Sequence, residues 1–260
     1  MAAMQASIKP SADPRIQYLL RIGDTALILA QRTAEWTGHA PVIEEDIALA
    51  NIGLDLIGQA RGLLTRACEI EGAGHDEDQL AFLREERDYR NVTLVELPRG
   101  DFAVTVVRNT IMSTFFKLLW ARLAQSSDAE VAAIAGKAIK EARYHQQHSA
   151  DWLVRLAQGT EESLARTTKA LDELWPYASE LFADDKVDEA AAQSGLGPRW
   201  SELKDAWFAE MKSIMDEARL AMPASTPFLS TGKTGVHSEH MGFMLTDMQY
   251  LQRAFPGGVW

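Results

Sequence analysis

The stretch PVIEEDIALANIGLDLIGQARGLLTRACEIEGAG, residues 41–74, carries the pattern that decides the fold class. Its apolar residues return at a 3-4 step, which is the period of an α-helix that buries one face. The residues on this step are Ile43, Ile47, Ala50, Leu54, Ile57, Leu64 and Ala67. Because no proline interrupts the stretch after Pro41, we expect one long helix that buries the face bearing these residues.

Segments of the same kind fill the rest of the chain. All nine prolines except Pro176 fall near the ends of long segments without proline, and proline is disfavoured inside helices. We expect further helices over residues 14–36, 79–90, 102–125, 129–158, 161–182, 200–221 and 237–255, with a kink at Pro176. The one strand-like run, Val92 to Val95, is too short to carry a sheet. The sequence therefore predicts an all-α fold: an elongated helical bundle formed as one domain by residues 14–260, behind a flexible N-terminal tail of residues 1–13.

Composition and charge narrow the classes of partner. The 260 residues are 47% hydrophobic, and 26 basic against 37 acidic side chains give a formal net charge of −11. This charge repels phosphate backbones and anionic lipids, which disfavours nucleic acid and membrane partners. Cys68 is the only cysteine, and the first residues lack the apolar core of a signal peptide, so we expect a soluble cytoplasmic protein.

A long bundle can hold two metal ions in its core when two helices each supply a Glu and two others each supply a Glu-x-x-His pair. No Glu-x-x-His occurs in this sequence. The nearest approach is Glu141 with His145, whose i, i+4 step shares one helix face and leaves Tyr144 at the expected histidine position. Together with Asp55, these two residues are candidates for a vestigial metal site.

A polar core without metal explains the same residues. Lys137 precedes Glu141 by one turn, and a protonated amine supplies the positive charge that a metal would otherwise bring. We therefore favour a buried Lys-Glu-His row of hydrogen bonds that includes His145 and His148. Six more polar residues could complete such a core, although an ordinary solvated face explains them nearly as well: Asp24, Gln31, Glu35, Asn51, Asp55 and Gln59.

The sequence GKTG at residues 232–235 is similar to the end of a phosphate-binding P-loop, but the first glycine of that motif falls at Pro227 and no strand precedes it. We reject that motif. Lys233, just before a helix N-terminus, is still a candidate contact for a CoA phosphate or an acidic partner residue. Capping and loop packing are its alternative roles. The run from His237 to His240, which opens the last helix, superficially resembles a metal-binding segment.

Three long blocks of the sequence, in this order, resemble one known family. They are RIGDTALILAQRTAEWTGHAPVIEEDIALANIGLDLIGQAR (21–61), KAIKEARYHQQHSADWLVRLAQGT (137–160) and GVHSEHMGFMLTDMQYLQRAFPG (235–257), the last close to Trp260. Together they resemble the structural subunits of phenylacetyl-CoA 1,2-epoxidases, from about residue 14 to residue 260.

This resemblance implies a ferritin-like helical fold within a bacterial multicomponent monooxygenase of aerobic phenylacetate degradation. In such a complex, a related catalytic subunit carries the di-iron centre, binds phenylacetyl-CoA and inserts oxygen to form the ring epoxide. A reductase with flavin and an iron–sulfur cluster delivers electrons from NADPH. The subunit resembled here forms a heterodimer with the catalytic one and supports the larger assembly. The resemblance therefore implies no catalytic residue in this chain and no cofactor bound by it.

Two other functions stay open at this point. An autonomous di-iron oxidase or iron-binding protein would need unusual ligands, with Glu141 and His145 among them. An acyl-CoA-binding helical module would use Lys233 and its neighbours to hold the nucleotide phosphates.

Overall fold

The computed structural model describes residues 6–258, and over these residues the chain is helical and contains no strand. The helices are α1 (Pro14–Ala34), α2 (Ile43–Glu71), α3 (Glu77–Phe82), α4 (Phe102–Leu123), α5 (Ala129–Ala157), α6 (Glu161–Leu174), α7 (Lys186–Ser194), α8 (Lys204–Ala218) and α9 (Glu239–Ala254). Short 3₁₀ segments lie between them at Glu86–Asp88, Thr93–Val95, Trp175–Phe182, Trp200–Leu203 and Gly232–Thr234. The predicted all-α fold is confirmed. Trp260 lies outside the described residues.

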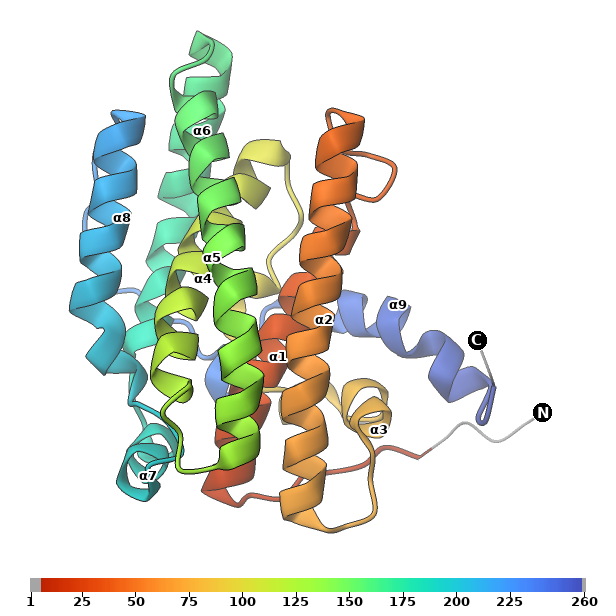
Figure 1. The fold of residues 1–260 in the computed structure, drawn as a ribbon. Coiled ribbons are helices and arrows are strands. Elements are labelled where there is room, and N and C mark those ends of the chain that lie inside the picture. Colours follow the sequence, from red (N-terminus) through yellow and green to blue (C-terminus); the bar gives the residue numbers. More distant parts are fainter. Residues whose placement is uncertain (1–5, 259–260) are drawn as a thin grey trace.

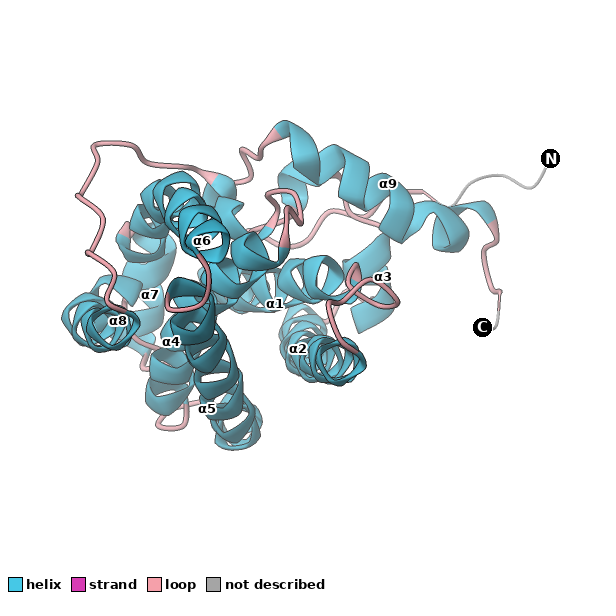
Figure 2. Cartoon of the chain, turned by 90° about the horizontal axis from the view of Figure 1, so that it is seen from above, coloured by secondary structure: helices cyan, strands magenta, loops and turns pink. Residues whose placement is uncertain are grey.

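Four long helices form the bundle that contains the core. Figure 1 shows α1 against α2 and α4 against α5, with α2 and α5 neighbouring and antiparallel. Helices α6 and α8 pack on α4 and α5, and α9 projects from the bundle on the side of α3 (Figure 2). Aromatic side chains fill the contact between α4, α8 and the 3₁₀ segments, where Trp120, Trp200 and Trp207 are fully buried.

Local signals in the sequence set the ends of the main helices. Asp13 caps α1 by accepting a hydrogen bond from the backbone N–H of Arg15 (2.8 Å). Asp128 caps α5 in the same way, through the N–H groups of its first turn. Gly72 ends α2 at a φ of 64°, a left-handed conformation that glycine adopts without steric penalty. These helices consequently begin and end close to the predicted positions.

Several segments differ from the sequence-based expectation, among them α7 (Lys186–Ser194), which lies outside every expected helix range. Pro176 does not kink a continuous helix, because α6 ends before it and the chain continues as the 3₁₀ segment Trp175–Phe182. Proline cannot donate the backbone hydrogen bond that a helix interior needs, so α-helical bonding stops there. The helix expected over residues 79–90 is split into the short α3 and the 3₁₀ turn Glu86–Asp88. The strand-like run near Val92 forms a 3₁₀ turn.

Helix α2 has apolar residues on two sides, and the predicted stripe is largely the exposed one. Its N-terminal half is open to solvent, with exposed fractions of 72% for Ile43, 58% for Ile47, 64% for Leu54 and 39% for Ile57. The buried face carries a different set: Leu49, Ile52, Leu56, Ala60 and Leu63. The prediction that the first stripe is buried is therefore wrong over this half, although Leu64 and Ala67 farther along it are buried. Both sets recur at helical spacing, so periodicity alone cannot choose between them.

Within the described residues, two helices are long and apolar enough to cross a membrane by length and composition alone, α2 and α4. In α4, 78% of the most apolar window is buried inside the protein, so the bundle core accounts for its apolar character. In α2 the buried share is 44%, which leaves its exposed stripe without an explanation inside the fold.

The predicted N-terminal tail, residues 1–13, lies outside the described residues over its first five positions. From residue 6 onward the segment follows the protein surface beside α3. The backbone N–H of Ile8 donates to the carbonyl of Leu83 (2.9 Å), and Pro10 is buried. The backbone N–H of Ser11 donates to Glu71 at the end of α2 (2.5 Å).

We expect Phe115→Ala to lower the free energy of unfolding by about 3–5 kcal/mol, because it removes a ring that is fully enclosed in the core. Phe115 is 0% exposed, and its ring centroid lies 4.8 Å from that of Trp200. Urea denaturation followed by circular dichroism measures the change. The matched control is Phe243→Ala on α9, where the side chain is 73% exposed and the change should stay within about 0.5 kcal/mol. Equal losses in the two variants would contradict the description of the core.

Candidate functional site

The centre of the four-helix bundle contains a small cavity that all four long helices line. Its volume is about 10 Å³, roughly the space of one water molecule. The lining residues are Leu29 from α1, Ile52 and Leu56 from α2, Asn109, Ser113 and Phe116 from α4, and His145 from α5. A bundle that binds two metal ions places its ligands in the bundle core, projecting inward from the four helices.

The residues around this cavity do not fit a di-iron centre. Such a centre needs several carboxylates, and the lining contains none, since its polar members are Asn109, Ser113 and His145. Ser113 is already engaged with Ser149, at 3.1 Å between the two hydroxyl oxygens. Across residues 6–258, no group of three or more His, Cys, Asp or Glu side chains is arranged to hold a metal ion. The donor set at the bundle centre is therefore that of a packed core.

The polar side chains next to the cavity form three cross-links between α2 and α5. His145 Nε2 lies 3.0 Å from Asp55 Oδ2, and His148 Nε2 lies 2.9 Å from a carboxylate oxygen of Glu45. Gln59 donates through Nε2 to a carboxylate oxygen of Glu141 at 3.0 Å. Each acidic side chain thus has a partner on the opposite helix.

His145 is the member of these pairs that reaches the cavity. Burial lowers the pKa of His145, although the hydrogen bond and the charge of Asp55 oppose this shift. The imidazole is therefore neutral near pH 7. Because an ionised carboxylate only accepts hydrogen bonds, Nε2 carries the proton that points to Asp55.

The predicted vestigial-site residues Asp55, Glu141 and His145 all lie at the interface between α2 and α5, but their side chains do not meet at one site. Asp55 contacts His145, whereas Glu141 contacts Gln59 and lies 3.6 Å from Lys137. The Lys137 side chain is 80% exposed, so the expected buried Lys-Glu-His row does not form. The polar groups of α5 turn toward α2 instead. Tyr144, at the position expected for a histidine, is exposed.

The other polar residues predicted for this core have separate roles. Asp24 is fully buried and pairs with Arg84 on the other side of α1. Glu35 pairs with Arg32 near the surface, and Asn51 is exposed. The residue that sequence reasoning missed is Glu45, which precedes Gln59 by two heptads and so lies on the same side of α2. The two-heptad spacing between Glu45 and Gln59 is the sequence pattern from which this contact could have been predicted.

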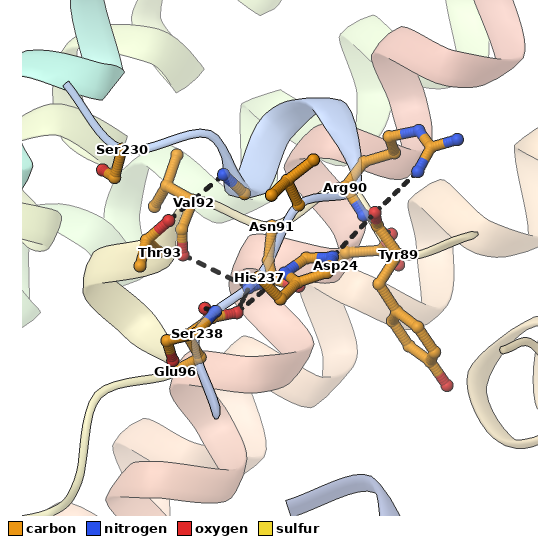
Figure 3. A network of polar contacts seen from close by, with 12 residues as sticks. Asp24, Tyr89, Arg90, Asn91, Val92, Thr93, Glu96, Ser230, His237 and Ser238 are labelled. Atoms are coloured by element: carbon orange, nitrogen blue, oxygen red, sulfur yellow. Dashed lines mark hydrogen bonds and ion pairs between the residues drawn. The ribbon is translucent and has the colours of Figure 1, made fainter. Parts of the chain in front are cut away.

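A second polar network fastens the segment before α9 to the chain that follows α3 (Figure 3). Glu96 is fully buried and contacts His237 Nδ1 (2.8 Å), the N–H of Ser238 (2.5 Å) and the amide of Asn91 (3.1 Å). His237 Nε2 lies 3.2 Å from the carbonyl oxygen of Tyr89. Both ring nitrogens of His237 therefore have partners within the protein. In the segment that resembled a metal-binding run, His237 holds the start of α9 against the chain that follows α3.

Lys233 belongs to the same anchored segment and is buried, with an exposed fraction of 4%. Its ammonium group donates to the carbonyl of Ala183 (2.8 Å) and lies 4.7 Å from the ring centre of Trp200. Its backbone N–H donates to buried Glu180 (2.7 Å). Burial lowers the pKa of Lys233, an effect that the charge of Asp188 opposes. In this position Lys233 is not accessible to a CoA phosphate or a partner residue at the surface, so the expected contact is corrected to loop packing.

Together, the all-α fold and the apolar lining of its centre define the chain as a helical-bundle protein. The chain belongs to the PaaA_PaaC family, described as phenylacetic acid catabolic protein, which matches it over residues 1–260. It is 48% identical over 243 residues to the C subunit of the 1,2-phenylacetyl-CoA epoxidase of Escherichia coli strain K12, an alignment that covers 94% of this chain and 98% of that protein. The resemblance found in the sequence is thereby confirmed, and with it a role in phenylacetate catabolism.

We expect the stability that the His237–Glu96 pair contributes to decrease as pH rises. Burial opposes the charged imidazole, but the hydrogen bond and the charge of Glu96 outweigh it and raise the pKa of His237. A raised pKa in the folded state stabilises the protein fully below the unfolded value of about 6.5, and this contribution is lost as pH rises through the folded value. Urea denaturation should show a larger deficit for His237→Asn at pH 6 than at pH 9.

The control for this experiment is the same substitution in a Glu96→Gln background. Without the carboxylate, the imidazole lacks its charged partner while burial still opposes its charge, so the deficit should no longer be larger at pH 6 than at pH 9. A deficit that is the same at both pH values in the native background would contradict the charged pair.

Proposed function

We propose that this chain is the non-catalytic structural subunit of a bacterial phenylacetyl-CoA 1,2-epoxidase, where it pairs with and stabilises the catalytic di-iron subunit. The observation that carries the proposal is the bundle centre, which apolar side chains and neutral polar groups occupy in place of carboxylate ligands. The 48% identity to the C subunit of such an epoxidase supports the choice of complex.

The α2–α5 cross-links support a structural role on physical grounds. In a di-iron bundle the metal ions tie the helices together through their ligands. Here the links are direct, from His145 to Asp55, from His148 to Glu45 and from Gln59 to Glu141. Such a bundle holds its helices in place without metal and leaves none of these acids without a partner.

The redox groups belong to other subunits in this proposal. The catalytic subunit carries the di-iron centre and holds phenylacetyl-CoA, and a reductase with flavin and an iron–sulfur cluster supplies electrons from NADPH. The formal net charge of −11 and the burial of Lys233 support the view that this chain does not itself hold the anionic CoA ester. We place the complex in the cytoplasm, in keeping with a chain whose only cysteine, Cys68, is buried on α2.

The test separates this chain from its catalytic subunit. Purified alone after growth with added iron, the chain should contain well under one iron per molecule and should not epoxidise phenylacetyl-CoA when the reductase and NADPH are present. Adding the catalytic subunit should restore turnover, and the two should elute together in gel filtration. Metal analysis by mass spectrometry and product analysis by chromatography provide the measurements.

The alternatives give different results in the same experiments. About two irons per chain, lost on Glu141→Ala or His145→Ala, would establish an autonomous di-iron protein and refute the proposal. Calorimetric binding of CoA to the isolated chain would instead favour an acyl-CoA-binding module. Glu69→Ala, an exposed acid on the same helix as Asp55, is the control that should leave iron content unchanged.

A further inference from the structure

A pocket with a volume of about 230 Å³ lies between the 3₁₀ segment Trp175–Phe182, the start of α8 and the connection that follows α8. It shares no lining residue with the small cavity at the bundle centre. Sites for small molecules are concave and largely apolar, with a few polar groups that fix the ligand. The lining of this pocket has that composition, and nothing in the bundle centre explains it.

Four aromatic rings form the walls of the pocket, which we call the aromatic pocket. They belong to Trp175, Phe182, Trp207 and Phe208. The ring of Trp207 is fully buried, and its centroid lies 5.2 to 5.3 Å from the centroids of the other three. The planes of these rings meet that of Trp207 at 33°, 58° and 88°, so the walls differ in orientation. A planar ring inside the pocket therefore has both faces and edges to contact, as aromatic pairs prefer.

Lys204 supplies the one charge among the described residues of the lining, whose other polar members are Ser179, Ser225 and Thr226. Lys204 Nζ lies 6.0 Å from the centre of the Phe208 ring, which places the ammonium group beside one wall of the pocket. The pocket thus combines an aromatic interior with a single cation.

The positive charge of Lys204 is not used within the described part of the chain. Two acids border the lining in sequence, Asp184 and Asp205. Asp184 accepts hydrogen bonds from the backbone N–H of Ser201 (3.0 Å) and from its hydroxyl. Within residues 6–258, neither acid forms an ion pair with Lys204. An anion in the pocket therefore meets an available cation and no carboxylate in the lining.

The size of the aromatic pocket limits what it can hold. An apolar cavity of about 150 Å³ is large enough to bind benzene. A volume of about 230 Å³ therefore accommodates one aromatic ring with a short substituent. A complete CoA ester is far larger than this space, so the shape favours a free acid.

We propose that the aromatic pocket binds a small monocyclic aromatic carboxylate, with the ring among the four aromatic walls and the carboxylate at Lys204. The ammonium group donates hydrogen bonds to the carboxylate, and Trp207 and Phe208 contact the ring. This inference goes beyond the proposed function and does not depend on it, because the pocket lies within this chain alone.

The experiment is isothermal titration calorimetry of the purified full chain with phenylacetate as the probe. Two further probes each lack one half of the recognition: hexanoate has the carboxylate without the ring, and 2-phenylethanol has the ring without the charge. Phenylacetate should bind at one site per chain, and each of the other two should bind about fivefold more weakly or less tightly still. Quenching of tryptophan fluorescence by phenylacetate provides a second readout, since two indoles form walls of the pocket.

Three variants place the ligand in the pocket. Lys204→Ala should weaken phenylacetate binding about fivefold and leave 2-phenylethanol binding unchanged, because only the first probe uses the charge. Phe208→Ala, which removes a wall at a residue that is 37% exposed, should weaken both. The matched control is Lys212→Ala on α8, an exposed lysine outside the lining, which should bind both probes as the native chain does. Thermal melting followed by circular dichroism identifies any variant that does not fold, and Lys204→Ala alone suffices for the test because its side chain is exposed.

The outcomes decide between the site and its alternatives. Loss of phenylacetate affinity in Lys204→Ala, with 2-phenylethanol and the Lys212→Ala control unaffected, supports the proposal. If the native chain binds no phenylacetate, the site is refuted. Equal affinity for hexanoate and phenylacetate would refute recognition of the ring, and unchanged phenylacetate affinity in Lys204→Ala would refute recognition of the carboxylate at this pocket. None of these results bears on pairing with a catalytic subunit, so failure here is distinguishable from failure of the proposed function.

Discussion

The packing at the centre of the four-helix bundle is the constraint on which the rest of the structure depends. Burying acidic groups between helices is unfavourable unless a cation or a hydrogen-bond donor compensates their charge. In this chain, apolar side chains such as Leu56 and Phe116 occupy the centre, and the acids lie at its edge with donors from the facing helix. The charges of these acids are therefore compensated by hydrogen-bond donors from the protein's own side chains.

The anchoring of α9 follows the same principle at a second place. Glu96 and Glu180 are buried carboxylates, and each is compensated by several donors from segments far apart in the sequence. Donors from residues 230–238 meet both acids, so the chain that leads into α9 is held by charge-assisted hydrogen bonds. Figure 3 shows His237 in this role, lying between Glu96 and Tyr89. The segment that leads into α9 is thus fixed to the bundle, although α9 itself projects from it.

The sequence predicted the helices well because their limits depend on local chemistry. Asp13 and Asp128 cap their own helices through neighbouring N–H groups, a pattern that is visible in the sequence itself. The side-chain partners were less predictable, because they depend on the register between helices. His145 and Asp55 were both singled out, yet their pairing depends on how α2 slides along α5. The burial of Lys233 was missed for a similar reason, since its contacts come from residues about 30 to 50 positions away.

The error over the buried face of α2 is informative about what this helix has to satisfy. A helix that packs on one neighbour keeps a polar outer side, whereas α2 repeats apolar residues at helical spacing on both sides. The sequence pattern was therefore read as the buried face, whereas the second apolar set is the one that packs into the bundle. Exposed isoleucine and leucine side chains carry a solubility penalty that a monomer has no reason to keep. Packing inside the bundle accounts for one apolar face of α2, and the exposed isoleucine and leucine side chains are the part of this helix that the fold itself does not require.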